Sequence, residues 1–127
     1  MADIKILVAD DSSTMRRILK QTLSRIGFND VTEATDGADA YTKCQSAQFD
    51  CILTDWNMPE MDGLELTMKI RAMPNYAKVP IMMVTTEGGK QDVIEALTQG
   101  VNQYIVKPFS QDILQAKMTE LLKPKTA

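Results

Sequence analysis

The stretch that decides the fold is IKILVADD at residues 4–11, where an apolar run ends on two adjacent aspartates, Asp10 and Asp11. A short apolar run of this kind is typical of a strand in a parallel sheet. Three further strand-like stretches each end on a residue that a phosphate-and-metal site can use: residues 51–54 before Asp55, residues 80–84 before Thr85, and residues 104–106 before Lys107. If these strands lie parallel in one sheet, three carboxylates, a hydroxyl and an ammonium meet at its carboxyl edge, where open α/β sheets bind ligands.

Amphipathic stretches alternate with these strands and carry helix start and stop signals. The first expected helix is capped by Ser12 and Ser13 and stops at Gly27; its apolar positions are Met15, Ile18, Leu19, Leu23 and Ile26. The second runs from Asp36 and Gly37 to about Gln45. The third runs from Asp62 to about Ala72 and is followed by a loop at Pro74. The last two are a helix around Val93, Ile94 and Leu97, stopped by Gly100, and a helix capped by Ser110 that buries Ile113, Leu114, Met118, Leu121 and Leu122 before Pro124. With a short strand at residues 31–34, five repeats of strand then helix predict a doubly wound α/β fold.

Length and composition restrict the function. The 127 residues suit one domain, which we expect to span residues 1–127. A net charge of -3 gives no basic footprint, so nucleic acid is not an expected partner, and no apolar run approaches the ~18 residues of a membrane span. Cys44 and Cys51 are interpreted as free thiols of a cytoplasmic protein, although a disulfide between them stays open. With no histidine, a zinc site is disfavoured, and a bound metal has to prefer oxygen ligands, as magnesium does.

The order of these residues resembles one family over essentially the whole chain. The acidic pair, Asp55, Thr85 and the Lys107-Pro108 pair, each after its own strand, resemble the receiver domain of bacterial response regulators. Residues 11–17, 55–59, 61–64 and 107–109 resemble the chemotaxis regulators of that family. The resemblance implies the strand order 2-1-3-4-5, which the apolar periodicity alone does not predict, and a cis bond before Pro108.

The resemblance also implies a role for each acidic residue. Asp55 is the expected phosphoacceptor, and Asp11, Asp55 and the backbone carbonyl of Asn57 are the expected Mg²⁺ ligands, with Asp10 acting through a bound water. Two such carboxylates ~5 Å apart repel by about 3 kcal/mol, so a cation relieves the site. An alternative is that the acidic pair merely caps the first helix.

The remaining site residues would act on the phosphoryl group or on its lifetime. Lys107 and Thr85 are expected to contact phosphoryl oxygens, and Asn57 and Glu87 to influence hydrolysis. Lys107 could instead be an exposed loop lysine, and Glu87 a solvated loop acid. Trp56, directly after the acceptor, is expected at the rim of the pocket.

A conformational switch is the last implication for the site. Thr85 would move toward the phosphate, and Tyr104 would pass from an exposed to a buried rotamer. This change would remodel a partner-binding surface on the fourth helix, fifth strand and fifth helix that includes Val93 and Tyr104. Alternatively, Tyr104 simply packs on the sheet. The Gly88-Gly89 pair makes the loop after Thr85 more permissive in backbone conformation.

The expected function is that of a stand-alone, monomeric messenger in chemotaxis, phosphorylated by a histidine kinase and binding the flagellar motor switch protein, with a phosphatase as a further partner. It would be a phosphoacceptor rather than an enzyme. A second hypothesis is a stand-alone receiver acting as a phosphate sink or relay. A magnesium-dependent phosphatase is disfavoured because Asp55 is followed by Trp56 and Asn57 rather than by an Asp-x-Asp pattern. A flavodoxin-like carrier is disfavoured because Asp10 and Asp11 replace the loop that a flavin phosphate needs.

Overall fold

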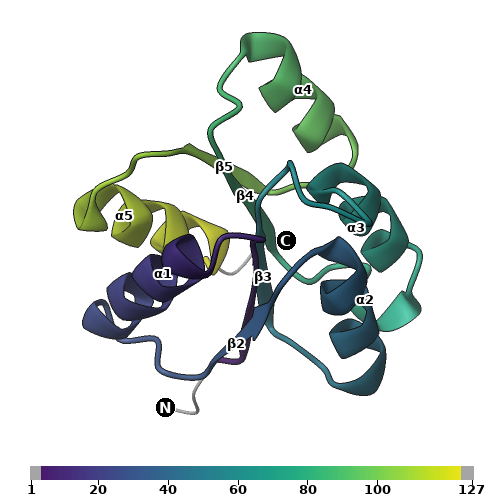
Figure 1. Cartoon of the computed structure of the whole chain (residues 1–127), viewed down its shortest axis with the longest axis horizontal. Coiled ribbons are helices and arrows are strands. Elements are labelled where there is room, and N and C mark those ends of the chain that lie inside the picture. The colour runs from purple at the N-terminus through teal and green to yellow at the C-terminus, as the bar shows by residue number, and fades with distance from the viewer. Residues whose placement is uncertain (1–3, 124–127) are drawn as a thin grey trace.

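The computed structural model describes residues 4–123 and places a five-stranded parallel sheet between two layers of helices (Figure 1). Along the chain the elements are β1 (Ile6–Ala9), α1 (Ser13–Arg25), β2 (Val31–Ala34), α2 (Gly37–Ser46), β3 (Cys51–Thr54), α3 (Gly63–Arg71), the 3-10 helix η1 (Pro74–Tyr76), β4 (Ile81–Thr85), α4 (Lys90–Thr98), β5 (Gln103–Val106) and α5 (Gln111–Leu121). The strand order is β2-β1-β3-β4-β5, so the predicted fold is confirmed.

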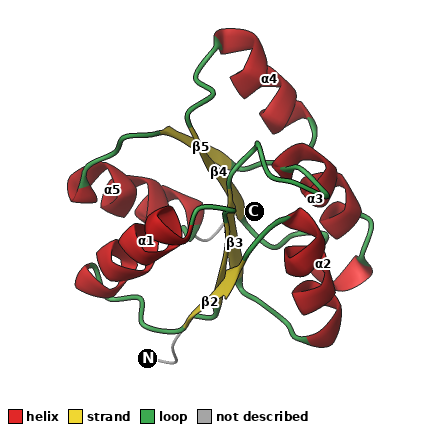
Figure 2. Ribbon diagram, in the orientation of Figure 1, coloured by secondary structure: helices red, strands yellow, loops and turns green. Residues whose placement is uncertain are grey.

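The three central strands, β1, β3 and β4, are buried on both faces because helices cover each side of the sheet (Figure 2), whereas the edge strands β2 and β5 are partly exposed. Alternate strand residues point to opposite sides. Leu7 and Ile52 belong to one apolar cluster, which is covered by α2, α3 and α4. Val8 and Leu53 belong to the other, which is covered by α1 and α5. Four of the five helices begin where a side chain caps the first turn: Ser12 for α1, Asp36 for α2, Asp62 for α3 and Ser110 for α5. The exception, α4, begins at Gly89 without a side-chain cap.

The structure corrects the expected burial of Ile113, whose relative exposure is 50%. The buried face of α5 is formed by Leu114, Met118 and Leu121, at helical spacing of four and three residues. Ile113 is one position, or about 100°, away from this face. Leu122 is only partly buried, and Ile18 of α1 is also exposed, at 41%.

The segment that begins at Pro74 forms η1 rather than an irregular loop, and the predicted helix end at Pro124 lies outside the described residues. Cys44 and Cys51 are free and buried, as predicted. Within residues 4–123, no helix has both the length and the apolar character needed to cross a membrane.

Candidate functional site

The register of the sheet brings the predicted carboxylates together. Ala9 of β1 is aligned with Thr54 of β3, so that Asp10 and Asp55 leave the sheet side by side. Carboxylate oxygens of Asp10, Asp11 and Asp55 all lie within 4.8 Å of one another. Asp10 is buried, Asp55 is half-buried and Asp11 is exposed, so the cluster opens to solvent on the Asp11 side.

Lys107 lies directly against two of these carboxylates. Its Nζ donates hydrogen bonds to Asp10 Oδ2 at 2.8 Å and to Asp55 Oδ2 at 2.9 Å. Only 9% of the Lys107 side chain is exposed, which rules out the alternative of a free loop lysine. Burial by itself lowers the pKa of Lys107, but the hydrogen bonds and charges of Asp10 and Asp55 outweigh it and hold that pKa above its ordinary value. The peptide bond from Lys107 to Pro108 is cis, as predicted.

Both paired aspartates are also held by backbone N–H groups. Asp10 Oδ1 accepts from Ser12 N at 2.9 Å, and Asp55 Oδ1 accepts from Trp56 N at 2.6 Å. The start of α3 lies so close to the backbone of Asp55 that a Cβ built on Gly63 would stand 2.0 Å from the Asp55 carbonyl oxygen. Only a glycine at position 63 lets helix α3 approach the expected acceptor this closely. Trp56 is half-buried and packs on the apolar cluster under α3.

Glu87 connects three of the other predicted residues. Its backbone N–H donates to Thr85 Oγ1 at 3.3 Å, and its carboxylate accepts from Asn57 Nδ2 at 2.8 Å. Its backbone carbonyl accepts from the Tyr104 hydroxyl. Glu87 is exposed but paired, so it is not simply a solvated loop acid. Asn57 and Glu87, which were each predicted to influence hydrolysis, therefore meet across the loops that follow β3 and β4.

Tyr104 is buried, with a relative exposure of 9%, and belongs to the apolar cluster that Val93 of α4 also contacts. Burial, together with the negative charges of Asp92, Glu87 and Asp55, raises the pKa of Tyr104 to about 12. The ring occupies the buried position of the predicted switch, and the exposed position stays a prediction. Thr85 is fully buried at the end of β4.

The donor set fits a magnesium ion. Mg²⁺ prefers carboxylate oxygens at about 2.1 Å, so two of its ligands stand at most ~4.2 Å apart. Oxygens within 4.8 Å of one another need only a small adjustment to meet that limit. Three carboxylates against one lysine also leave the cluster with excess negative charge, which a divalent cation neutralises. Asp10, Asp11 and Asp55 are the residues that could hold the ion.

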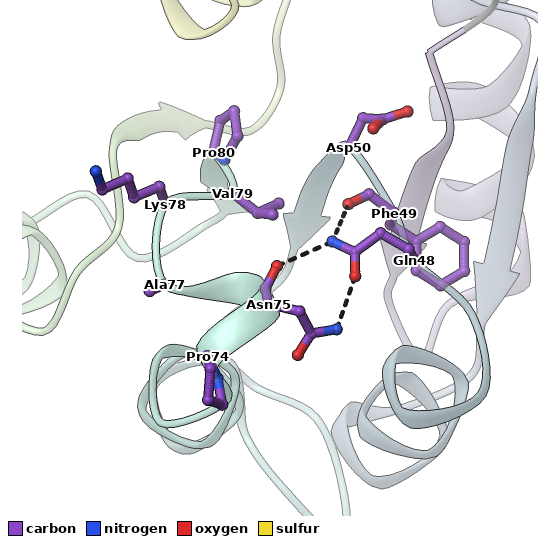
Figure 3. A pocket seen from close by; sticks show the side chains of 9 residues that line it. All are labelled: Gln48, Phe49, Asp50, Pro74, Asn75, Ala77, Lys78, Val79 and Pro80. Atoms are coloured by element: carbon purple, nitrogen blue, oxygen red, sulfur yellow. Dashed lines mark hydrogen bonds between the residues drawn. The ribbon is translucent and has the colours of Figure 1, made fainter.

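A hollow of about 400 Å³ lies at the end of the sheet opposite the carboxylate cluster, before β3 and β4 (Figure 3). There the Gln48 Nε2 donates to the Asn75 carbonyl at 3.0 Å, and Asn75 Nδ2 donates back to Gln48 Oε1 at 2.7 Å. None of the predicted site residues lines this hollow. The carboxylate cluster is therefore the candidate functional site.

Two contributors to the site were not predicted from the sequence. One is Gly63, whose close approach to Asp55 only the three-dimensional packing reveals. The other is Arg16, whose guanidinium reaches the carbonyl of Asp10. The capping pattern of Asp62 and the helical position of Arg16 were visible, but neither indicates a contact with the strand ends.

Comparison with known proteins gives the same picture. A model of the response regulator receiver domain family matches residues 6–119. Chemotaxis protein CheY1 of Helicobacter pylori is 54% identical over 120 residues, covering 94% of this chain and 97% of that protein. A chemotaxis protein CheY homolog of Campylobacter jejuni is 55% identical over 122 residues, covering 94% and 92%.

Solved structures are similar over nearly the full length. Vibrio cholerae CheY4 has a TM-score of 0.89 and 36% identity, covering 95% of this chain and 100% of that chain. The receiver domain of sensor histidine kinase PA1611 from Pseudomonas aeruginosa has a TM-score of 0.87 and 30% identity, covering 97% and 100%. That structure is described as having a magnesium ion coordinated in its active site cleft.

Proposed function

This chain belongs to the response regulator receiver domain family, and we propose that it is a magnesium-dependent phosphoacceptor that carries a chemotaxis signal. Asp55 takes a phosphoryl group from a histidine kinase. The observation that carries the proposal is the double hydrogen bond of Lys107 Nζ to Asp10 and Asp55. It places one cation between the proposed nucleophile and a neighbouring carboxylate, where a phosphoryl oxygen needs a positive partner.

The proposed chemistry follows from the surroundings of Asp55. One of its carboxylate oxygens attacks the phosphorus of a phosphohistidine, forming an O–P bond while the P–N bond breaks and the imidazole leaves. The Asp55 side chain is half-buried rather than fully buried, with 13% of it exposed to solvent. Trp56 N–H and Lys107 hold the carboxylate in one orientation, so that little reorganisation is required. A bound Mg²⁺ would neutralise phosphoryl oxygens.

Lys107 and Thr85 would bind the transferred group. Lys107 already lies at 2.9 Å from Asp55 Oδ2 and can turn its ammonium to a phosphoryl oxygen. Thr85, with its hydroxyl accepting a long hydrogen bond of 3.3 Å from Glu87, can donate to another oxygen after a small displacement. Asn57 and Glu87, joined at 2.8 Å over the loops beside the cluster, would control the access of water to the acyl phosphate.

A role in chemotaxis is supported by the CheY relatives and by one surface. The match covers nearly the full length of each of these relatives, and we propose one receiver domain over residues 1–127. Three large apolar side chains on α4 and β5 are exposed by about half: Ile94 at 47%, Leu97 at 47% and Val106 at 45%. These elements also carry Val93 and Tyr104, the proposed contacts to the flagellar motor switch protein. We place the protein in the cytoplasm, as a monomer that a phosphatase can reach.

Phosphate uptake is tested with acetyl phosphate and Mg²⁺, measured by intact mass and by Trp56 fluorescence. The wild type should gain one phosphoryl group, and the adjacent carboxylate should transmit the change to Trp56. Asp55→Asn should gain none and keep its fold by circular dichroism. Asp112→Asn, which removes an exposed carboxylate in the first turn of α5, is the matched control and should behave as the wild type. Labelling of Asp55→Asn at the wild-type level would move the acceptor elsewhere.

The chemotaxis role is tested by measuring binding to the motor switch protein with and without acetyl phosphate. Phosphorylation should tighten binding by about 1–3 kcal/mol, as is typical of allosteric coupling. Tyr104→Ala should spare phosphorylation but weaken this binding, whereas Tyr41→Ala, on α2, is the aromatic control outside the proposed surface. Binding that is indifferent to phosphate would favour the sink or relay role instead.

A further inference from the structure

Arg16, in the first turns of α1, joins three elements beside the carboxylate cluster. Its Nη1 donates to the backbone carbonyl of Asp10 at 2.5 Å, and its Nε donates to Glu33 Oε1 of β2 at 3.0 Å. Only 12% of the Arg16 side chain is exposed, so the guanidinium is confined between the end of β1 and β2. The planar fork of an arginine suits two directed contacts of this kind, which a flexible lysine ammonium does not reproduce.

The carbonyl that Arg16 holds belongs to the peptide unit linking Asp10 to Asp11. A peptide unit is planar, so fixing its oxygen also fixes the direction in which the chain enters Asp11. The other polar groups of Asp10 are held independently, since its backbone N–H donates to Ala34 O and its carboxylate is bound by Ser12 N and Lys107. Within residues 4–123 the Asp11 carboxylate forms no ion pair, so its placement depends on the backbone that precedes it.

Glu33 keeps the guanidinium in place from the far side. It is aligned with Val8 in the sheet, one residue before the end of β2, and its second oxygen lies 3.9 Å from Lys20 Nζ. Glu33 also offsets the positive charge of Arg16. The main role of Arg16 is therefore to connect β1, α1 and β2 through directed hydrogen bonds, rather than to add positive charge to the cluster.

We propose that Arg16 is a positioning residue that orients Asp11 as a ligand for a divalent cation, acting through the Asp10–Asp11 peptide and anchored by Glu33. This inference rests on the proposed function of the same site. For the change in Mg²⁺ affinity when Arg16 is removed, it predicts the opposite sign to simple electrostatics. If only charge mattered, removing a cation beside three carboxylates would strengthen Mg²⁺ binding; if Arg16 positions Asp11, its removal weakens that binding.

The experiment is a Mg²⁺ titration of the full chain, followed by Trp56 fluorescence and, separately, by the Mg²⁺-dependent shift of the urea unfolding midpoint. Arg16→Gln and Arg16→Lys should each raise the Kd for Mg²⁺, by roughly tenfold for a residue that orients a ligand. Glu33→Gln should raise it by less, because the carbonyl contact remains. Arg17→Gln removes the same charge from the exposed neighbouring residue and should leave the Kd within about twofold or lower it.

The outcomes separate this inference from the proposed function. If the wild type binds Mg²⁺ and is phosphorylated on Asp55, but Arg16→Gln binds Mg²⁺ equally or more tightly, the positioning role is overturned and the proposed function stands. If the wild type neither responds to Mg²⁺ nor takes up phosphate, the proposed function itself fails. Arg16→Lys keeps the charge and serves as the folded reference if Arg16→Gln is unstable. A wild-type Kd for Arg16→Lys would also overturn the role.

Discussion

Replacing Asp11 with asparagine should stabilise the protein without Mg²⁺ and remove most of its response to Mg²⁺. Asp10 and Asp55 share Lys107 as a partner, whereas Asp11 has no ion-pair partner within residues 4–123. Its carboxylate is nevertheless held within 4.8 Å of both others. Asparagine keeps the size of the side chain and removes its charge, so the repulsion disappears while the backbone is unchanged.

The size of the gain follows from these distances. At 4.8 Å, two carboxylates repel by about 0.9 kcal/mol in a water-like dielectric and by about 3.5 kcal/mol at an effective dielectric near 20. Asp11 is exposed, so the lower figure applies. Two such pairs amount to roughly 2 kcal/mol, and the attraction of Lys107 cancels part of it. We therefore expect Asp11→Asn to gain about 1 kcal/mol in the free energy of unfolding.

With Mg²⁺ bound, the wild type should become more stable than Asp11→Asn. An ion that binds only the folded protein stabilises it by about 2.7 kcal/mol when its concentration is a hundred times its Kd. The wild type would gain this amount, while a variant lacking one charged ligand would gain little at the same concentration. Urea unfolding followed by far-ultraviolet circular dichroism, with and without Mg²⁺, measures both free energies. Added monovalent salt should shrink the gain of the variant, because exposed charges are screened.

Glu95→Gln is the matched control, since it removes one exposed carboxylate from α4, away from the cluster. It should change neither the stability without metal by more than a few tenths of a kcal/mol nor the response to Mg²⁺. The reasoning is refuted if Asp11→Asn is less stable than the wild type without metal. It is equally refuted if both proteins gain the same free energy from Mg²⁺.

Three further predictions concern a buried tyrosine, the two buried cysteines and two glycines. Tyr104 should ionise only near its pKa of about 12 in the folded protein. The free energy of unfolding should therefore fall as the pH rises from 10, the ordinary tyrosine pKa, to 12, because the unfolded state loses its proton first. The difference in near-ultraviolet absorbance between the wild type and Tyr104→Phe isolates the ionisation of Tyr104. Burial raises the pKa of Cys44 to about 11 and that of Cys51 to about 12, so a thiol reagent at about pH 8 should react only after unfolding, and rapid labelling of the native protein would contradict the burial. Gly63→Ala should lower the free energy of unfolding by roughly 3 kcal/mol or more, because its Cβ would stand 2.0 Å from the Asp55 carbonyl oxygen. Gly88→Ala, the control, should change it by no more than about 1 kcal/mol. Urea unfolding midpoints of the two variants measure this difference.

The fold was predictable from the sequence because its signals are local. Ser12, Asp36, Asp62 and Ser110 cap helices within one turn of their own position, so three or four consecutive residues carry the whole signal. The order of the strands was not predictable in this way. It depends on which strand hydrogen-bonds to which, and only the family resemblance supplied it.

The rotation of the helices was less predictable than their existence. Ile94 and Leu97 indicated α4 correctly, but both are exposed, and Ala96 is the only buried residue of that helix. An apolar residue adjacent to the buried face has the same hydropathy as one within it. Packing on the sheet determines which of these residues is buried, and the local sequence pattern does not predict it.

The contacts that join the site residues to one another were the least predictable part. Asn57 and Glu87 lie 30 positions apart, and their contact depends on the conformations of two loops. Arg16 reaches Asp10 only because α1 turns back over the end of β1. The sequence identified the acidic pair, Asp55, Thr85 and Lys107 as residues that can do the chemistry, because they lie at the carboxyl ends of strands. It did not identify those that hold them in place, which differ from surface residues only in what they touch.

We propose that Glu87 links phosphorylation of Asp55 to Tyr104 on β5. A phosphoryl group brings charge on the order of -2 and new acceptor oxygens into a cluster where Lys107 is already shared between two carboxylates. The hydroxyl of Thr85, which accepts a long bond of 3.3 Å from Glu87, is the donor that can be drawn toward them at low cost. Because the carbonyl of the same Glu87 accepts from Tyr104, a displacement of Thr85 acts on the residue that holds the Tyr104 ring. In this proposal Glu87 couples the acceptor site to β5, and removing its carboxylate would leave the coupling intact because both contacts use the backbone.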